Sequence, residues 1–351
     1  MTVLAERSSV RTRSPRRRRS VAAQAERRAG WLFAGPAVLV LLVFLIAPML
    51  MAMWVSLLHW DGQSNPFSGT ARFAGLANYA DLLGHDGLLR QNFSTSVRNT
   101  LYYVVLDVPL VTVLSFALAL IVNRRRGFFR TVFYFPSITS SVAIGVTFLF
   151  LFQGSGAVNA ILGFVGIHGP SWFTDSRGLI QLVLTGTGLV DPNQLPSWLN
   201  TEVFSLSVWD WLAGPSVAMC AIIALTVWSS SGTFMLFFLS GLQNIPGTVE
   251  EAALIDGATT WQRFRHVTLP LMRRSLVLVI TLALIGSWQV FDQVYVMSQG
   301  SPGGTTMTPA YLSYTTSFGD GNFGGGAAIA FVLFAIIVAF TAVQRWLGRS
   351  T

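Results

Sequence analysis

Six apolar stretches dominate this sequence, and each has the length of about 20 residues that a helix needs to cross the hydrocarbon core of a bilayer. They occupy residues 31–57, 99–122, 131–152, 217–242, 276–296 and 327–346. Charged residues make up only 11% of the chain, whereas soluble domains carry about 25%. The sequence therefore predicts an all-α polytopic membrane protein with six transmembrane helices.

The basic residues indicate how these helices are oriented. All 23 of them are arginine, and nineteen fall in four segments that flank the apolar stretches. The four segments are 1–30, 124–130, 263–274 and 345–349, and the other arginines are Arg72, Arg90, Arg98 and Arg177. Because positive charge accumulates on the cytoplasmic side of a membrane, both the N- and C-termini are predicted to be cytoplasmic.

Residues 1–30 are polar and rich in arginine, and they contain too few apolar side chains to fold alone. We expect a disordered cytoplasmic tail that touches anionic lipid of the bilayer and does not bind nucleic acid. Residues 31–57 then form the first transmembrane helix, and residues 58–98 form an extracytoplasmic loop. Residues 99–347 make a core of five further helices.

A second extracytoplasmic segment covers about residues 153–211 and holds a single arginine among several glycines and prolines. Within it, residues 179–190 are too short and too interrupted by glycine to span a membrane. We expect either a short strand or an interfacial stretch there. The role of the whole insertion is left open by its sequence.

Residue types that are absent exclude several functions. The chain has no lysine, so it has neither a Walker A phosphate loop nor a lysine for pyridoxal-phosphate chemistry. Cys220 is the only cysteine and permits neither an internal disulfide nor a cysteine-based zinc site. The histidines are scattered at His59, His85, His168 and His266. We therefore expect no catalytic residues, no metal site and no cofactor on this chain.

Residues 244–270 form one of the few charged segments between two apolar stretches. Thr248 with Glu251, and Thr259 with Gln262, have the spacing of capping boxes that open two short helices. Gly257 lies where the first helix needs a left-handed residue to end. Leu269 and Pro270 are expected to stop the second helix, because proline lacks the N–H group that a helix interior requires.

This segment resembles the EAA loop of bacterial ABC-importer permeases, of the carbohydrate-uptake branch in particular. The matching residues are Glu251, Ala252, Ala253, Asp256, Gly257, Leu269 and Pro270, with Val267 where the family usually has isoleucine. The resemblance covers the chain from Asn99 to its end, and residues 31–57 fit the extra first helix of that branch. It implies the type I importer permease (MetI-like) fold, with these residues docking on a separate ATPase.

The resemblance also implies the partners of the chain. They are a second, homologous permease subunit, a homodimeric ATP-binding subunit that holds ATP and magnesium, and an extracytoplasmic solute-binding lipoprotein. The implied location is the bacterial cytoplasmic membrane.

Two acidic residues, Asp107 and Asp292, lie inside apolar stretches, where a carboxylate costs about 2.5 to 3.5 kcal/mol on insertion scales. Asp292 belongs to an aromatic segment that is similar to one in sugar permeases. The candidates for a substrate pathway are Trp228, Trp288, Phe291, Asp292, Tyr295 and Asp107. Two alternatives to a role in transport remain. Asp292 could be solvated or cap a helix, and Asp107 could be an interaction partner for Tyr102, Tyr103 or a neighbouring helix.

Residues 229–232 are small and lie near the middle of the fourth stretch. For such residues in lipid, packing between helices is favoured over contact with a substrate. The function that the resemblance implies is import of a sugar or oligosaccharide, with energy from the separate ATPase. The alternative is an ion-driven secondary transporter acting alone, which would be expected to carry an inverted repeat that is not visible here. A polytopic membrane enzyme is a third and weaker interpretation.

Overall fold

A computed structural model of the chain describes residues 16–67, 71–123, 127–191 and 195–349. The chain divides into two compact units, Met1–Trp54 and Val55–Thr351. Each unit is described separately below.

The first unit is helical throughout its described part. Helix α1 (Arg16–Leu41) continues through a π-helical turn, η1 (Leu42–Ile46), into α2 (Ala47–Ser56). The apolar side chains from Trp31 onward are exposed, as expected for a helix that faces lipid. Residues 16–30 are helical where disorder was predicted, because alanine, glutamine, glutamate and arginine favour a helix and here extend an existing one. The rest of the predicted tail, 1–15, lies outside the described residues.

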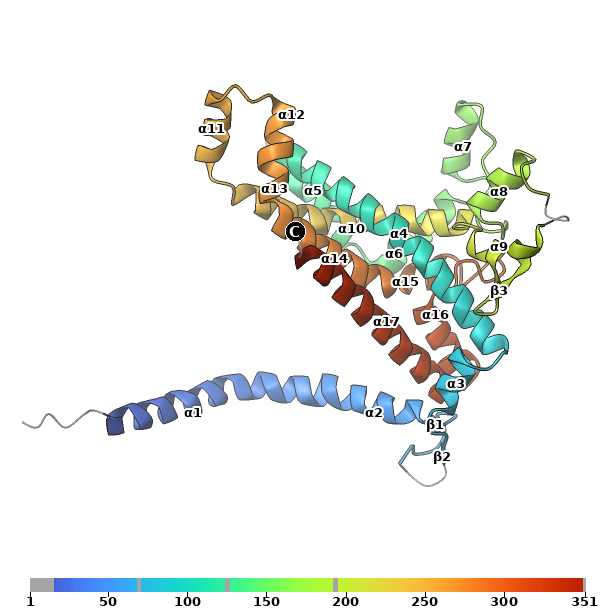
Figure 1. Cartoon of the computed structure of the whole chain (residues 1–351), viewed down its shortest axis with the longest axis horizontal. Coiled ribbons are helices and arrows are strands. Elements are labelled where there is room, and N and C mark those ends of the chain that lie inside the picture. The colour runs from blue at the N-terminus through green and yellow to red at the C-terminus, as the bar shows by residue number, and fades with distance from the viewer. Residues whose placement is uncertain (1–15, 68–70, 124–126, 192–194, 350–351) are drawn as a thin grey trace, which may run out of the picture. The chain divides into compact units, whose positions relative to one another are not determined.

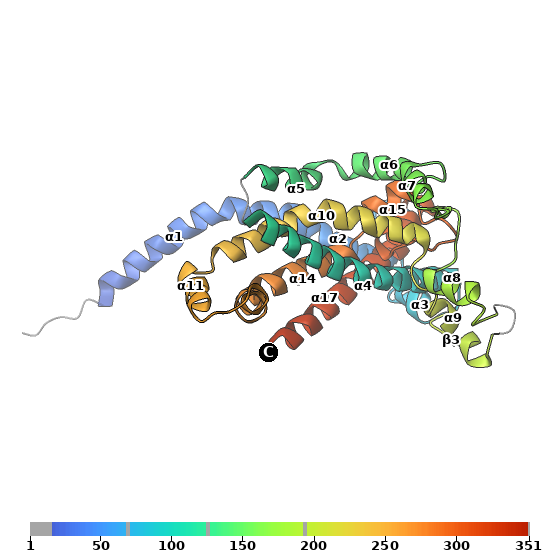
Figure 2. The same ribbon diagram turned by 90° about the horizontal axis from the view of Figure 1, so that it is seen from above.

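The second unit opens with two short strands, β1 (Leu58–His59) and β2 (Arg72–Phe73), which pair antiparallel, and with helix α3 (Ala77–Leu83). Its long helices are α4 (Leu88–Asn123), α10 (Val217–Gln243), α14 (Arg273–Trp288) and α17 (Phe323–Arg349). These four helices pack side by side (Figures 1 and 2).

Among the described residues, four helices are long and apolar enough to cross a membrane, and two bent helix pairs bring the number to as many as six. The four are Glu26–Ser56, Leu88–Asn123, Val217–Gln243 and Phe323–Trp346. The first, second, fourth and sixth predicted spans therefore correspond to single helices. The third and fifth do not.

The third predicted span, 131–152, is broken into α5 (Phe128–Ile138) and α6 (Ser141–Leu151), which meet at 90°. The hydroxyl of Ser137 donates to the carbonyl of Ser229 at 2.6 Å and accepts from the N–H of Thr233 at 3.1 Å. In a regular helix the N–H of Thr233 would bond the carbonyl of Ser229 directly. The hydroxyl of Ser137 is therefore inserted between these two backbone groups of α10. This attachment to α10 holds α5 in place at the break, which a count of apolar residues does not reveal.

The fifth predicted span, 276–296, is also interrupted. Helix α14 ends at Trp288, and a separate short helix, α15, covers Asp292–Met297. The carbonyl of Val290, in the break between them, accepts a hydrogen bond from the hydroxyl of Thr308 at 2.9 Å. Irregular backbone is tolerated at membrane depth only where protein or a water-filled cavity satisfies its polar groups, and Thr308 provides one such partner.

The insertion between α6 and α10 folds into short elements. They are α7 (Ala157–Phe164), α8 (Leu179–Gly186), η2 (Ser197–Asn200), β3 (Glu202–Val203), β4 (Leu206–Ser207) and α9 (Val208–Trp211). The strand considered for residues 179–190 is wrong, because Leu179–Gly186 is a helix. The N–H groups of Leu179 and Ile180 bond the carbonyls of Pro215 and Ala213, so the start of α8 is tied to the segment before α10.

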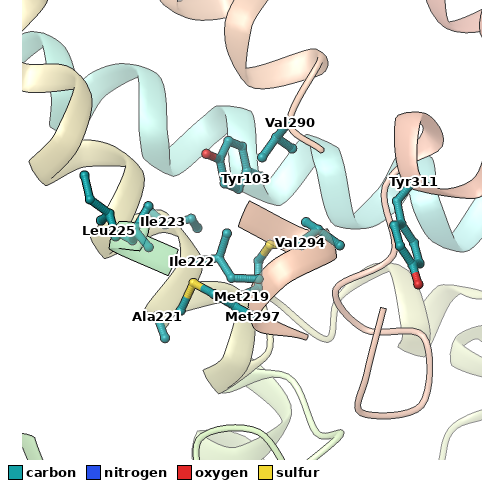
Figure 3. Packing of buried hydrophobic residues seen from close by; sticks show 11 residues of the cluster. Tyr103, Met219, Ala221, Ile222, Ile223, Leu225, Val290, Val294, Met297 and Tyr311 are labelled. Carbon is teal, nitrogen blue, oxygen red and sulfur yellow. The ribbon is translucent and has the colours of Figure 1, made fainter. Parts of the chain in front are cut away.

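One of the four buried hydrophobic clusters of the described residues lies where α4 and α10 meet the interrupted fifth span. Met219 and Ile222 of α10 are fully buried and pack in one cluster with Tyr103 of α4 (Figure 3). Val294 and Met297 of α15 also belong to this cluster. Two further elements, α16 (Pro309–Tyr314) and the π-helical turn η4 (Thr315–Gly319), precede α17.

Gly232 of α10 tests the contact between α10 and α5. A Cβ atom there would lie 2.3 Å from the carbonyl oxygen of Phe133 and 2.8 Å from the hydroxyl of Ser137. We expect Gly232→Ala to separate the two helices and to destabilise the protein by about 1–3 kcal/mol. Thermal unfolding in detergent would measure this as a lower Tm. Gly286→Ala is the matched control, since a Cβ at Gly286 meets nothing within 4 Å; equal Tm values for the two variants would contradict the prediction.

Candidate functional site

The charged segment forms two short helices joined by a turn at Gly257. Helix α11 covers Gly247–Ile255, and Gly257 follows it with φ +73°. The N–H of Ala258 bonds the carbonyl of Ala253, and the N–H of Gly257 bonds that of Leu254, both at 3.0 Å. This is the Schellman arrangement, in which a left-handed residue ends a helix. The predicted role of Gly257 in the backbone is confirmed.

Only one of the two predicted capping boxes forms. Thr259 and Gln262 bond each other reciprocally at the start of α12 (Thr260–Arg263), as predicted. The prediction of a capping box by Thr248 and Glu251 is wrong, because α11 begins at Gly247 and its N-cap residue is Pro246. Thr248 is therefore already inside the first turn, where its side chain is not in the capping position.

The second helix does not stop at Leu269 and Pro270, contrary to the sequence prediction. A π-helical turn, η3 (Phe264–Thr268), leads into α13 (Leu269–Leu271), so the helix runs through the proline. The N–H of Leu269 bonds the carbonyl of Phe264, five residues earlier. The wider π turn accommodates the proline ring, and the chain bends by 65° only at the junction with α14.

The turn end of this segment is exposed, whereas its second half is anchored. Ile255 is 86% exposed and Trp261 is 65% exposed. Phe264 packs against the buried cluster at the same end of α4 and α10, with its ring centroid 5.9 Å from that of Phe116. Figure 1 shows α11 and α12 at one end of the unit, beside the end of α17. We call residues 247–271 the coupling element, after the role that the resemblance implies for this segment.

A second feature is a cavity of about 340 Å³ at the break between α14 and α15, which we call the span cavity. Its lining comes from α4, α10 and both sides of the break. The polar residues that line it are Tyr103, Asp107, Thr226, Ser230, Ser287, Gln289, Asp292 and Gln293. Polar groups inside a membrane span are stable where protein partners, water or a ligand satisfy them, because lipid does not.

Asp107 is 4% exposed and faces the span cavity from α4. Its Oδ2 accepts a hydrogen bond from the hydroxyl of Ser287 on α14 at 2.7 Å, and its Oδ1 has no hydrogen-bond partner among the described residues. The hydroxyl of Tyr102 instead donates to the carbonyl of Trp211. Of the alternatives for Asp107, a hydrogen bond to a neighbouring helix is therefore the one that is observed. It uses only Oδ2 and leaves Oδ1 without a partner among the described residues.

Asp292 is exposed and lines the same cavity from the first turn of α15. It accepts a hydrogen bond from the hydroxyl of Ser141 on α6 at 3.0 Å. Phe291, not Asp292, is the N-cap residue of α15, so the helix-capping alternative is wrong in its strict sense. The structure thus brings two carboxylates that are far apart in sequence to one polar cavity.

The other pathway candidates divide into two groups. Phe291 lines the span cavity, and the half-exposed ring of Tyr295 stacks beside it at 5.6 Å. Trp288 is fully buried against Phe340 instead. Trp228 packs on Phe148. Neither tryptophan lines the cavity.

Sequence reasoning missed Ser287, Gln289 and Gln293 as lining residues. Two glutamines within an apolar stretch are the signal that points to them. For the small residues of α10, the sequence left helix packing and substrate contact as alternatives. Ser229 and Gly232 pack on α5, whereas Ser230 lines the cavity.

Residues 111–351 match the family model of the binding-protein-dependent transport system inner membrane component. The chain belongs to this family. It is therefore the membrane permease subunit of an ABC transport system and not an enzyme, and this membership decides against a secondary transporter that acts alone.

Curated relatives match this permease over nearly its whole length. The trehalose/maltose transport system permease protein MalF of Thermococcus litoralis is 30% identical over 92% of this chain and 95% of its own. The lactose transport system permease protein LacF of Rhizobium radiobacter is 28% identical over 91% and 94%. A solved bacterial ABC transporter that imports the acidic polysaccharide alginate shares the fold, with a TM-score of 0.66 and 17% identity over 94% of this permease and 99% of that chain.

Water in the span cavity can be tested by cysteine labelling. Cys220, the only cysteine, is first replaced by alanine, and Gln293→Cys is then introduced at the cavity wall. We expect a charged, water-soluble methanethiosulfonate reagent to modify the cysteine of Gln293→Cys at least about tenfold faster than that of Leu278→Cys. A thiol in apolar surroundings has a raised pKa, and each unit by which its pKa is raised lowers the reactive thiolate fraction about tenfold. Leu278 lies on α14 and is exposed, but it does not line the cavity. Equal labelling at the two positions would show that the cavity holds no water.

Proposed function

We propose that this permease subunit carries a sugar or oligosaccharide through the span cavity. The observation that carries the proposal is the composition of the cavity wall at the break between α14 and α15. It presents hydroxyl, amide and carboxylate groups beside the ring of Phe291, and the described residues that line it include no arginine or histidine. Such a wall suits a neutral molecule with many hydroxyl groups better than an anion. The sugars named for the curated relatives agree with this choice.

Asp107 and Asp292 are proposed to bind substrate hydroxyl groups directly. Asp107 Oδ1 is buried and free to accept a hydrogen bond, which a sugar hydroxyl would donate. Phe291 and Tyr295 would contact the apolar face of the sugar ring. Trp228 and Trp288 are not included in this proposal, because they do not line the cavity.

The coupling element is proposed to dock on the ATP-binding subunit. The proposed contact residues are Glu251, Ala252, Ala253, Asp256, Gly257, Leu269 and Pro270. Glu251, Ala252, Asp256 and Gly257 are exposed around the turn. A cavity of about 760 Å³ between α11, α12 and the end of α4 offers room for side chains of the partner. ATP and magnesium would be held by that partner.

The same proposal includes a second permease subunit, a homodimeric ATPase and an extracytoplasmic solute-binding lipoprotein. It places both termini and the coupling element in the cytoplasm, following the distribution of arginine. One observation supports the placement of the C-terminus. A guanidinium N–H of Arg273 donates to the carbonyl of Gly348 at 3.1 Å, so the end of α17 lies beside the start of α14 and the coupling element.

Affinity purification of the tagged chain from native membranes tests the assembly. We expect a P-loop ATPase and a second permease to co-purify, and ATP-dependent uptake of ¹⁴C-labelled maltose, trehalose or lactose by proteoliposomes that contain the complex and its binding protein. A chain that purifies alone and still supports uptake would overturn the proposed function.

Substitution of the turn residue tests the coupling element. Gly257→Pro removes the N–H that bonds the carbonyl of Leu254 and replaces φ +73° by a φ near −65°. We expect the protein to insert normally but to lose the ATPase on purification. ATP-driven uptake should fall by about tenfold or more, since about 1.4 kcal/mol of lost docking free energy already gives tenfold.

Gly188→Pro provides a matched control for this substitution. Gly188 has φ +71° after α8, and the N–H groups of Gly188 and Leu189 bond the carbonyls of Thr185 and Leu184 in the same Schellman arrangement. A Cβ at either glycine meets nothing within 4 Å. If Gly188→Pro lost the ATPase as completely as Gly257→Pro, the effect would be general misfolding and the proposed docking would be wrong.

A further inference from the structure

Six aromatic side chains form an uninterrupted series in the second unit, although they come from separate parts of the sequence. In spatial order they are Trp60, Phe323, Phe318, Tyr314, Tyr295 and Phe291, which we call the aromatic series. Successive ring centroids lie 5.2–5.6 Å apart. Each ring therefore touches the next, at separations usual for aromatic pairs.

The series connects two cavities. Trp60 lines a cavity of about 580 Å³ together with Asp61 and Asn322, which is the residue before Phe323. At the other end, Phe291 lines the span cavity beside Asp292. A polar cavity thus lies at each end of the series, and aromatic rings cover the distance between them.

The backbone holds the first rings rigidly. The N–H of Phe323 bonds the carbonyl of Trp60 at 3.1 Å. Gly62 has φ +80°, and a Cβ atom there would lie 2.3 Å from the ring of Phe323, so only glycine permits this packing. Further along, Tyr311 is buried behind the series, with its ring 6.3 Å from that of Phe291.

One side of the series is open. Phe318 is 68% exposed, Tyr295 is 41% exposed and Tyr314 is 36% exposed. The exposed side of α4 carries aliphatic residues, among them Val105, Leu110 and Val113. The aromatic series instead combines flat apolar faces with tyrosine hydroxyls, which suits a ligand that is apolar on its ring faces and polar at its edges.

We propose that the aromatic series is a guide path along which the sugar rings of the substrate move between the outer cavity at Trp60 and the span cavity. The inference rests on the proposed function and adds residues outside the span cavity to it. A pathway of several similar and weak sites allows entry without trapping the ligand, which is the requirement for conduction. Stacking on aromatic side chains also tolerates different sugars, because the contact depends on the face of the sugar ring and not on the pattern of its hydroxyl groups.

Phe318 is the best position for a test, because its ring is the most exposed of the series and its loss leaves no buried cavity. In proteoliposomes with the complete importer and its binding protein, we expect Phe318→Leu to lower uptake of ¹⁴C-labelled maltose, trehalose or lactose by about tenfold. ATP hydrolysis stimulated by the loaded binding protein should remain at the wild-type rate. The amount of sugar imported per ATP therefore falls.

Two variants serve as controls. Phe318→Tyr retains a ring and should import sugar at close to the wild-type rate. Phe334→Leu makes the same substitution at an exposed position of α17 that belongs to no aromatic pair among the described residues, and it should also be unaffected.

Two results would overturn the guide path while leaving the proposed function intact. The first is wild-type import by Phe318→Leu, or a loss shared equally with Phe334→Leu. The second is a loss of the second permease from purified Phe318→Leu, which would identify the series as a subunit contact. A wild-type importer that takes up none of the three sugars would instead count against the proposed function itself.

Discussion

Inside a membrane every backbone polar group needs a hydrogen-bond partner, and this requirement governs the two places where predicted spans are broken. Two helices predicted to be continuous are broken, and the polar groups near both breaks have protein partners. Ser137 bridges backbone groups of α10, and Thr308 bonds the carbonyl of Val290. The second break opens onto the span cavity. Irregular backbone is stable there because water, polar side chains or a ligand replace the missing helical bonds.

The position of α14 connects the coupling element with the span cavity, the two sites to which we assign a function. Its first residue follows the coupling element at a 65° bend, and its last residue precedes the break that lines the span cavity. Ser287, near the end of α14, also holds Asp107 of α4. A displacement of the coupling element would therefore be transmitted along one rigid helix to the cavity wall, since packed helices move as units. The aromatic series reaches the same wall from the opposite direction, through Phe291.

Local backbone features of the coupling element were predictable because they depend on neighbouring residues alone. Gly257 and the box of Thr259 and Gln262 form as their spacing predicts. The predictions for Thr248 and Pro270 failed where a neighbour changed the outcome. Pro246 moved the start of α11 to Gly247, and a π turn carried the helix through Pro270.

The sequence by itself determined that the chain is an all-α membrane protein, located the four spans that are single helices, and located the coupling element, because hydropathy and turn chemistry are local properties. It also identified Asp107 and Asp292 as costly residues. Only the tertiary structure decided that these two carboxylates share one cavity, that Trp288 turns away from it, and that six rings from distant segments form one series. Those facts depend on how helices break and pack against each other, and such contacts join residues that no local pattern relates.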